Sequence, residues 1–351
     1  MKLLDTTLRD GSYVINFQFS ADDTRQIAGE LDKAKVEFIE VGHGVGLGAS
    51  RKGEGVARET DETYMKAAAD VVTNGSWGMF CIPGIAEMSD LESAIDHDMG
   101  FVRVGVSIDR VAAAEPFVAR AKEAGLFVAV NFMKSYTRPP AEFAQACATA
   151  GAFGADIAYL VDSAGNMLPQ TIEDYVNETK NVTDVALGFH GHNNLGLANA
   201  NALKAMELGV EVIDSSLQGM GRCTGNTITE HFVAILDRSG YKHNFDLFRL
   251  MDTSELLVRP FLTQVGLDSV DLACGLAGFH SSYMSVIRDA CITHNVDPRA
   301  LIMDLCEETR DVAPVDLVDE LARKISAKNT ENNYRHRFPL RQYFGHEQDI
   351  L

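Results

Sequence analysis

The sequence contains no long apolar run, and positively charged residues are scarce in it. No segment approaches the ~18 consecutive apolar residues that a membrane-spanning helix needs, and the first residues show no signal-peptide pattern. Against 50 acidic residues there are only 31 Lys and Arg, which leaves a formal net charge of −19 and disfavours contact with nucleic acid. We therefore expect a cytoplasmic protein that works without a membrane or a nucleic-acid partner.

Paired cysteine motifs are also absent. The 6 cysteines are scattered with no Cys-x-x-Cys spacing, which is typical of a reduced protein and not of a disulfide scaffold. Five of them are interpreted as small apolar filler. Cys223 stands in a glycine-rich loop near a strand end, where it could line a pocket, but filler is the favoured role there too.

Eight short apolar or β-branched runs alternate with amphipathic, helix-like stretches. The predicted strands are Lys2–Asp5, Phe38–Val41, Trp77–Ile82, Phe101–Val106, Phe127–Phe132, Ile157–Val161, Ala186–Phe189 and Val212–Ser215. Strict alternation indicates parallel strands joined by right-handed crossovers, and eight units favour a (β/α)₈ TIM barrel. A doubly wound sheet would carry a glycine-rich phosphate fingerprint after the first strand, where this chain has Arg9-Asp10-Gly11. The predicted fold class is therefore α/β, a TIM barrel with a C-terminal, mostly helical extension.

The pattern changes after residue 240 from alternating strands to helices alone. The helices predicted there are Leu247–Phe261, Phe279–His294, Pro298–Cys306 and Val315–Lys328. We thus predict a catalytic barrel over 1–240, a helical domain over 241–330 and a basic, aromatic tail over 331–351. The tail is interpreted as packing on its own barrel or on a neighbouring subunit, in preference to binding RNA.

Polar residues follow most of the predicted strands. In a TIM barrel the catalytic groups come from the carboxyl ends of different strands, so these side chains should face one mouth. They are Arg9, Asp10, Glu40, His43, Arg103, Asn131, Asp162, Ser163, His190, His192 and Gln218. For any one of them a structural role, such as a helix cap, is an equal alternative. Arg103 inside the barrel needs an anion, either Glu40 or a substrate carboxylate, and we favour Glu40.

Three of these residues have the chemistry of a metal site. Residues two apart in a strand project to the same face, so His190 and His192 can direct both imidazoles into one cavity. Two imidazoles and the hard carboxylate of Asp10 make a mixed nitrogen and oxygen site, suited to Mn²⁺, Mg²⁺, Zn²⁺ or Fe²⁺. The alternative is that the His-x-His pair is incidental and only hydrogen-bonded at a strand end.

Three motifs together resemble a known family. They are Thr6-Thr7-Leu8-Arg9-Asp10-Gly11, Gly188-Phe189-His190-Gly191-His192-Asn193 and the loop Gly219-Met220-Gly221-Arg222-Cys223-Thr224-Gly225-Asn226. They are similar to the metallolyase superfamily of (β/α)₈ barrels, which includes hydroxymethylglutaryl-CoA lyase, isopropylmalate and homocitrate synthases, and 4-hydroxy-2-oxovalerate aldolase. Segments 34–47 and 275–283 resemble the aldolases, and Ser12-Tyr13 replaces a Gln usual in the other branches. The resemblance therefore favours the aldolase branch.

The resemblance implies a divalent-metal aldolase, which cleaves or forms a 4-hydroxy-2-oxo acid through a metal-bound pyruvate enolate and gives pyruvate plus an aldehyde. The matching metal ligands are Asp10, His190, His192 and Asn226, with Mn²⁺ as the favoured ion. Arg9 matches the arginine that stabilises the enolate oxygen. The candidate substrate-binding residues are Ser163, Glu40, His43 and Arg103.

The chain departs from this family at the acid–base pair. The aldolases have a catalytic His at the position of Tyr13 and a Tyr at the position of His280, so the two residue types are reversed here. We hypothesise that the pair has exchanged places and still serves the C4 hydroxyl group. The equal alternative is that both residues only pack and that the substrate or the reaction has changed.

Two other functions stay open at this point. The first is a Claisen condensation of an acyl-CoA with a 2-oxo acid, as in the synthases, and the second is a non-catalytic binding or scaffold role. A scaffold would be expected to have lost its metal ligands, which this chain retains. The family also implies a partner at the C-terminal helical region, either an acylating aldehyde dehydrogenase or a second copy of the chain.

Overall fold

The computed structural model describes residues 1–262 and 269–328. Eight parallel strands close into a barrel in the order β1 to β8, because β8 pairs with β1. The strands are β1 Lys2–Asp5, β2 Phe38–Glu40, β3 Ser76–Cys81, β4 Phe101–Val106, β5 Phe127–Phe132, β6 Ile157–Asp162, β7 Ala186–Gly191 and β8 Val212–Ser215. All eight predicted strands are confirmed, and four of them have the predicted bounds. The TIM barrel expected from the sequence is therefore the observed fold.

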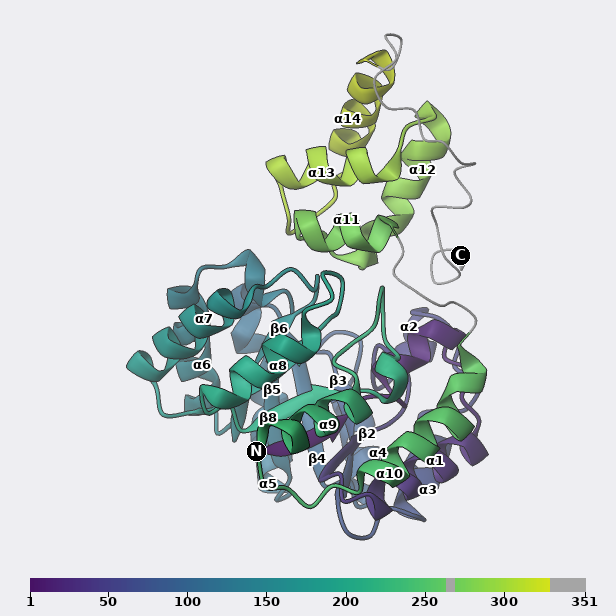
Figure 1. The fold of residues 1–351 in the computed structure, drawn as a ribbon, viewed down its shortest axis with the longest axis vertical. Helices are drawn as coiled ribbons and strands as arrows, with labels where there is room; N and C mark the ends of the chain where they lie inside the picture. Colours follow the sequence, from purple (N-terminus) through teal and green to yellow (C-terminus); the bar gives the residue numbers. More distant parts are fainter. Residues whose placement is uncertain (263–268, 329–351) are drawn as a thin grey trace.

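Helices surround the barrel on its outer side (Figure 1). They are α1 Ala21–Lys33, α2 Ala49–Lys52, α3 Asp61–Ala69, α4 Met88–Asp96, α5 Glu115–Glu123, α6 Pro140–Ala152, α7 Pro169–Val182, α8 Ala198–Glu207, α9 Thr229–Ser239 and α10 Leu247–Thr253. A π-helical turn, Ser254–Val258, and a 3₁₀ turn, Arg259–Phe261, extend α10 to the end of the helix predicted there. None of the helices described is long and apolar enough to cross a membrane.

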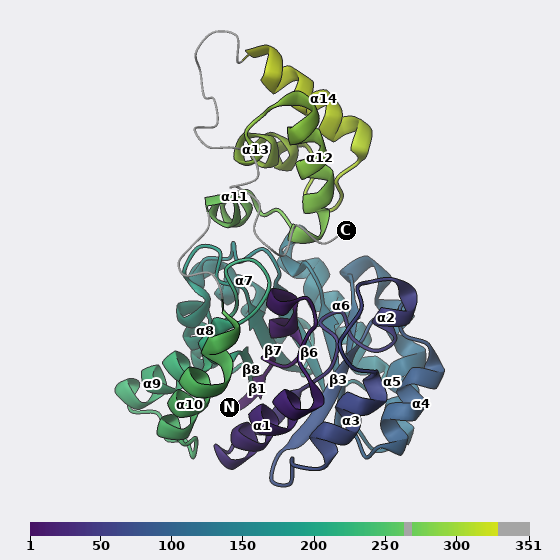
Figure 2. The same cartoon turned by 90° about the vertical axis from the view of Figure 1, so that its right-hand side faces the viewer.

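The last four helices form a separate layer over one end of the barrel. They are α11 Ser269–Ala277, α12 Met284–His294, α13 Pro298–Glu308 and α14 Val315–Lys328. Figures 1 and 2 show them stacked above the barrel in two perpendicular views. They have a hydrophobic cluster of their own that begins at Val270, whereas α10 contributes Leu250 to the barrel's cluster. The domain limits stay a prediction, and we propose that the helical unit begins after Leu262 and not at 241.

The sequence-based helix prediction was wrong at two places in this layer. Helix α11 was not predicted, and α12 begins at Met284 and not at Phe279. The reason for the late start is local. Gly278 takes a positive φ of +73°, and His280 caps the 3₁₀ turn Ser281–Tyr283 that precedes α12. The predicted tail over 331–351 lies outside the described residues.

Side chains inside the barrel are arranged in layers. Phe38, Phe101 and Val212 are the first residues of β2, β4 and β8, and they belong to an apolar cluster within the barrel. Because side chains of a strand alternate between its faces, the third residue of each strand also points inward. The apolar layer thus fills the amino-terminal end of the barrel, and polar chemistry is confined to the carboxyl-terminal end.

Candidate functional site

The next interior layer is charged. It is built by the third residues of the same three strands, Glu40, Arg103 and Asp214, which are all fully buried. Arg103 Nη1 donates to Glu40 Oε2 at 2.8 Å, and Arg103 also donates through Nη2 to Asp214. The Arg103–Glu40 pair predicted from the sequence is therefore present. Asp214 is a second partner that the sequence analysis missed.

The charged layer supports the residues above it. Glu40 Oε2 also accepts a hydrogen bond from Arg9 Nε at 2.7 Å, and Arg9 Nη1 donates to Asp10 Oδ1 at 2.9 Å. On the other side, Asp214 Oδ2 lies 2.8 Å from His190 Nδ1. A chain of ion pairs and hydrogen bonds thus runs from Asp10 to His190. An imidazole that donates its Nδ1–H keeps the lone pair of Nε2 for a metal ion. The contact with Asp214 therefore orients the Nε2 atom of His190 toward His192.

The predicted metal ligands lie together. One ligand atom from each of Asp10, His190 and His192 falls within 4.8 Å of the others, and all three residues are buried. The Nε2 atoms of His190 and His192 face each other at 3.3 Å. Asn226 Nδ2 donates to Asp10 Oδ2 at 2.8 Å. The Oδ1 atom of Asn226 has no hydrogen-bond partner in the described structure. These residues could hold a divalent metal ion.

The protonation of this cluster suits a cation. Burial alone would raise the pKa of Asp10, but Arg9 and the two histidines outweigh it and hold that pKa well below its usual range. Burial lowers the pKa of His192 to about 4, so its imidazole is neutral at neutral pH. An ionised carboxylate and neutral imidazoles are the forms that bind a metal ion.

The charge balance of the buried network also fits a divalent ion. Three carboxylates, those of Asp10, Glu40 and Asp214, face two guanidinium groups, those of Arg9 and Arg103. Isolated buried charge is costly, and one negative charge remains without compensation in this network. A divalent cation bound by Asp10, His190 and His192 would compensate it.

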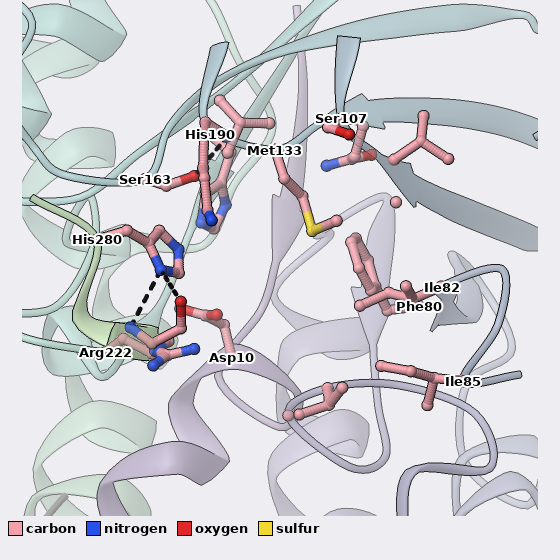
Figure 3. Close-up of a pocket in the computed structure, with 18 of the residues that line it drawn as sticks. Asp10, Phe80, Ile82, Ile85, Ser107, Met133, Ser163, His190, Arg222 and His280 are labelled. Carbon is pink, nitrogen blue, oxygen red and sulfur yellow. Dashed lines mark hydrogen bonds between the residues drawn. The ribbon is translucent and has the colours of Figure 1, made fainter. Parts of the chain in front are cut away.

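A cavity of about 420 Å³ opens in front of this cluster. Figure 3 shows Asp10, Arg222 and His280 on one side of it, and Phe80, Ile82 and Ile85 on the opposite side. Of the predicted site residues, the cavity is lined by Arg9, Asp10, Tyr13, Ser163, His190, His192 and His280. The structure therefore brings the expected catalytic residues and most expected ligands to one place.

Three predicted substrate-binding residues do not reach the cavity. Glu40 and Arg103 lie behind Arg9 in the charged layer, and neither lines the cavity. His43 is fully buried, its ring is stacked on that of Phe17 with centroids 3.9 Å apart, and its Nδ1 accepts from the backbone N–H of Val45. Of the four predicted substrate-binding residues, Ser163 alone lines the cavity.

His280 enters the cavity from the helical layer. Its Nδ1 accepts a hydrogen bond from the backbone N–H of Ser282 at 3.1 Å, so Nε2 is the nitrogen left for the cavity. Burial, together with the nearby positive charges of Arg222 and Lys134, holds the pKa of His280 well below its usual range. Its imidazole is therefore neutral at neutral pH.

Tyr13 and His280 are linked through a residue that the sequence analysis did not assign. The guanidinium carbon of Arg222 lies 4.5 Å from the centre of the Tyr13 ring, and Figure 3 shows Arg222 beside His280. Lys134, at the end of β5, is a second unassigned cation of the wall. Both residues occupy loops that follow strands, Lys134 after β5 and Arg222 after β8. That position, inside a chain with few basic residues, is the signal that could have identified them.

The fold and the cavity define a class: a TIM barrel with an aspartate–bis-histidine cluster at the carboxyl ends of its strands. Comparison with known proteins specifies it further. The model of the family described as HMGL-like matches residues 1–257. The chain therefore belongs to the HMGL-like family, as its motifs predicted.

Individual relatives extend this similarity beyond the barrel. A 4-hydroxy-2-oxovalerate aldolase of Rhodococcus opacus (strain B4) is 38% identical over 94% of this chain and 95% of its own length. An oxaloacetate decarboxylase of Mycobacterium tuberculosis (strain ATCC 25618 / H37Rv) is 39% identical over 82% of this chain and 85% of its own length. Among solved structures, the N-terminal domain of a putative aldolase from Bacteroides vulgatus shares the fold, with a TM-score of 0.69 and 22% identity over 88% of this chain and 97% of that one.

Proposed function

We propose that the protein is a divalent-metal-dependent aldolase that cleaves or forms a 4-hydroxy-2-oxo acid, giving pyruvate and an aldehyde. The observation that carries this proposal is the buried Asp10–His190–His192 cluster, which opens into a cavity beside the guanidinium group of Arg9. The relatives named 4-hydroxy-2-oxovalerate aldolase support the same assignment. The favoured ion is Mn²⁺, because the cluster combines a carboxylate with imidazoles and leaves one side open to the cavity.

Cleavage of the C3–C4 bond moves negative charge onto the 2-oxo oxygen. A divalent ion bound at the cluster would act as a Lewis acid on the 2-oxo group. Arg9 is held in place by Glu40 and Asp10 and lies over the Phe80 ring at 4.7 Å, so its guanidinium is preorganised before substrate arrives. A fixed cation beside the developing enolate oxygen is the largest stabilising contribution that the chain's own residues offer.

The C4 hydroxyl group has to lose its proton during cleavage. His280 and Tyr13 line the same cavity on either side of Arg222, and we assign the proton transfer to this pair. The neutral imidazole of His280 and the phenol of Tyr13 can each donate or accept a hydrogen bond at the hydroxyl group. Their common placement supports exchanged positions in the pair over a purely packing role.

The opposite wall indicates where the aldehyde fragment lies. Phe80, Ile82, Ile85 and Met133 present apolar surface to the cavity, away from Asp10 and His280 (Figure 3). Burial of each methylene group against such a wall is worth about 0.8 kcal/mol. We therefore expect the aliphatic carbons of the substrate to lie against these side chains.

A second candidate is decarboxylation of oxaloacetate. The relative named oxaloacetate decarboxylase favours it, and breaking the C3–C4 bond of oxaloacetate with loss of its C4 carboxylate as CO₂ forms the same pyruvate enolate. Arg9 would stabilise that enolate in the same way. The two reactions differ only in the group that leaves C3.

A partner protein belongs to the same proposal. Leu276 of α11 and Ile292 of α12 are largely exposed apolar residues in the helical layer above the cavity. We propose this layer as the binding surface for an acylating aldehyde dehydrogenase that receives the aldehyde, or for a second copy of the chain. Gel filtration of the protein alone distinguishes these two partners, because a dimer of the chain forms without the dehydrogenase.

Pyruvate release tests the proposed function. The purified protein is incubated with a panel of 4-hydroxy-2-oxo acids and with oxaloacetate, in the presence of Mn²⁺, Mg²⁺ or a chelator, and pyruvate is coupled to lactate dehydrogenase. We expect metal-dependent release from at least one hydroxy acid, and none from Asp10→Ala. Release from oxaloacetate alone would favour the second candidate, and no release from any compound by metal-loaded protein would refute both.

A further inference from the structure

The charge of the cavity wall is opposite to the charge of the protein. The chain has a formal net charge of −19, yet among the residues that the structure describes the cavity is lined by four basic residues and two acidic ones. The basic residues are Arg9, Arg110, Lys134 and Arg222, and the acidic ones are Asp10 and Glu54. Arg9 is accounted for by its ion pairs with Asp10 and Glu40. The carboxylate of a 2-oxo acid is assigned to the metal-ligand cluster and Arg9, so Lys134 and Arg222 are further cations in the wall.

Lys134 is the most informative of them. No carboxylate pairs with its ammonium group in the part of the chain that the structure describes, and its contacts are the hydroxyl and the ring of Tyr283. Its backbone takes a left-handed conformation with φ of +58°, which is unfavourable for a residue with a side chain. Such strain persists where the surrounding structure imposes it, and it is concentrated at functional sites.

Lys134 and Arg222 act on the same point of the wall. Arg222 lies beside His280 (Figure 3), and Lys134 Nζ lies over the Tyr283 ring, whose centre is 6.2 Å from that of His280. Both cations line the cavity that also contains the metal-ligand cluster. Arg222 comes from the loop after β8 and Lys134 from the end of β5, so the two cations approach His280 from different strands. Both cations therefore border the part of the cavity next to the helical layer.

We propose that Lys134 and Arg222 form a second anion subsite, and that the physiological substrate is a 4-hydroxy-2-oxo acid with a second carboxylate on the fragment beyond C4. This inference rests on the proposed function, since it specifies the substrate of the same site. The 2-oxo acid end is assigned to the cluster and Arg9, and the second carboxylate to Lys134 and Arg222. The aliphatic carbons between them would lie against Met133 and Phe80.

Two pairs of compounds of equal length test the subsite. The first pair is 4-hydroxy-2-oxovalerate and 4-hydroxy-2-oxoglutarate, which differ only in a methyl group or a carboxylate at C5. The second pair, 2-oxovalerate and 2-oxoglutarate, lacks the C4 hydroxyl group and cannot be cleaved by the aldolase reaction, so it reports binding alone. Kinetics are measured on the first pair and calorimetry on the second, both with Mn²⁺-loaded protein.

A charge-assisted contact gives a preference of about tenfold to a hundredfold. We expect the wild-type protein to prefer the dicarboxylate of each pair by at least about tenfold, and K134M to lose most of this ratio. K134R keeps the charge and should retain the preference. The matched control is K66M, which removes an exposed lysine of α3 paired with Glu62 and should leave the ratio unchanged.

The outcomes separate the two proposals. A preference of the wild-type protein for the monocarboxylate would overturn the second subsite. An equal loss of affinity for both compounds of a pair in K134M would also overturn it, because the lysine would then bind the 2-oxo acid end that the two compounds share. If neither hydroxy acid yields pyruvate but 2-oxoglutarate still binds more tightly through Lys134, the subsite stands and the aldolase reaction fails. If pyruvate forms from both with no preference, the aldolase reaction stands and the subsite fails.

Discussion

Replacement of Asp214 by asparagine tests the assignment of the charged layer as support for the metal ligands. Asp214 is fully buried, and its Oδ2 accepts from His190 Nδ1 at 2.8 Å and also from Arg103. Asp214→Asn keeps the size of the side chain but removes its negative charge. The variant leaves Arg103 with Glu40 as its only carboxylate partner in the described structure, and the amide can present an N–H group where His190 needs an acceptor.

The expected loss of metal affinity follows from the role of Asp214 as the carboxylate that orients a metal-binding histidine. Loss of a carboxylate that orients a metal-binding histidine reduces metal affinity about 10- to 100-fold, or roughly 1.4–2.7 kcal/mol. Two effects act in the same direction here, because the charged layer becomes less negative and the orientation of His190 is no longer fixed. We therefore expect Asp214→Asn to lie toward the upper end of that range.

Calorimetric titration with Mn²⁺ measures this effect without any need for activity. Asp237→Asn is the matched control, since Asp237 also pairs with a histidine, His243, at 3.1 Å, but is more than half exposed. This control should bind Mn²⁺ like the wild type. If Asp214→Asn also binds Mn²⁺ within about twofold of the wild type, while His190→Ala does not bind it, the proposed orienting role of Asp214 is wrong.

Three further predictions concern other parts of the chain. His280→Ala should lower kcat for aldol cleavage by about 10²- to 10⁴-fold with Mn²⁺ binding retained, and intact cleavage in this variant would refute the acid–base role. Gly225→Ala should destabilise the protein by about 3 kcal/mol in urea unfolding, because φ is +85° and the new Cβ would lie 1.8 Å from the carbonyl oxygen of Gly219; a loss below about 1 kcal/mol would contradict this. Burial raises the pKa of Asp5 from 3.8 to about 6, so the folded protein retains a proton that the unfolded chain releases, and stability should fall as pH rises from about 4 to about 6. Asp5→Asn should reduce this slope in urea unfolding measured across that range, and an unchanged slope would show that other groups cause it.

The barrel could be predicted because its strands are simple in composition. β4 and β5 are mostly apolar and each follows a glycine-marked turn, and their predicted bounds were confirmed. Helix α11 was missed because Gly275 interrupts its short apolar pattern. That glycine fits the packing of α11 on the barrel, since a Cβ there would lie 2.7 Å from the Cβ of Asn194.

The candidate site was predictable where two sequence signals agreed. His190 and His192 are two residues apart at the end of β7, and Asp10 directly follows the arginine after β1, so both motifs suggested ligands before any geometry was known. Asp214 gave no such signal because it is a lone acidic residue in a short strand. Its alternation with Val212, which lies in the interior apolar cluster, would have placed it inside the barrel.

One sequence does not show which polar residues near strand ends line the cavity and which are buried beneath it. His43 and Arg103 follow or occupy strands as cavity residues do, but the structure buries both completely. Neither Lys134 nor Arg222 was assigned a role of its own from the sequence, because only the closure of the barrel brings the loops after β5 and β8 to the same wall. The spatial arrangement of loops therefore had to come from the structure.

The central claim is that this protein forms the enolate of pyruvate at the Asp10–His190–His192 cluster, and proton exchange tests it most directly. Pyruvate is incubated with Mg²⁺-loaded protein in D₂O, and loss of the methyl signal is followed by nuclear magnetic resonance, which requires no knowledge of the aldehyde fragment. We predict metal-dependent exchange above the rate without protein, which Asp10→Ala abolishes. Exchange no faster than this background, with metal binding verified in the same sample, would contradict the account.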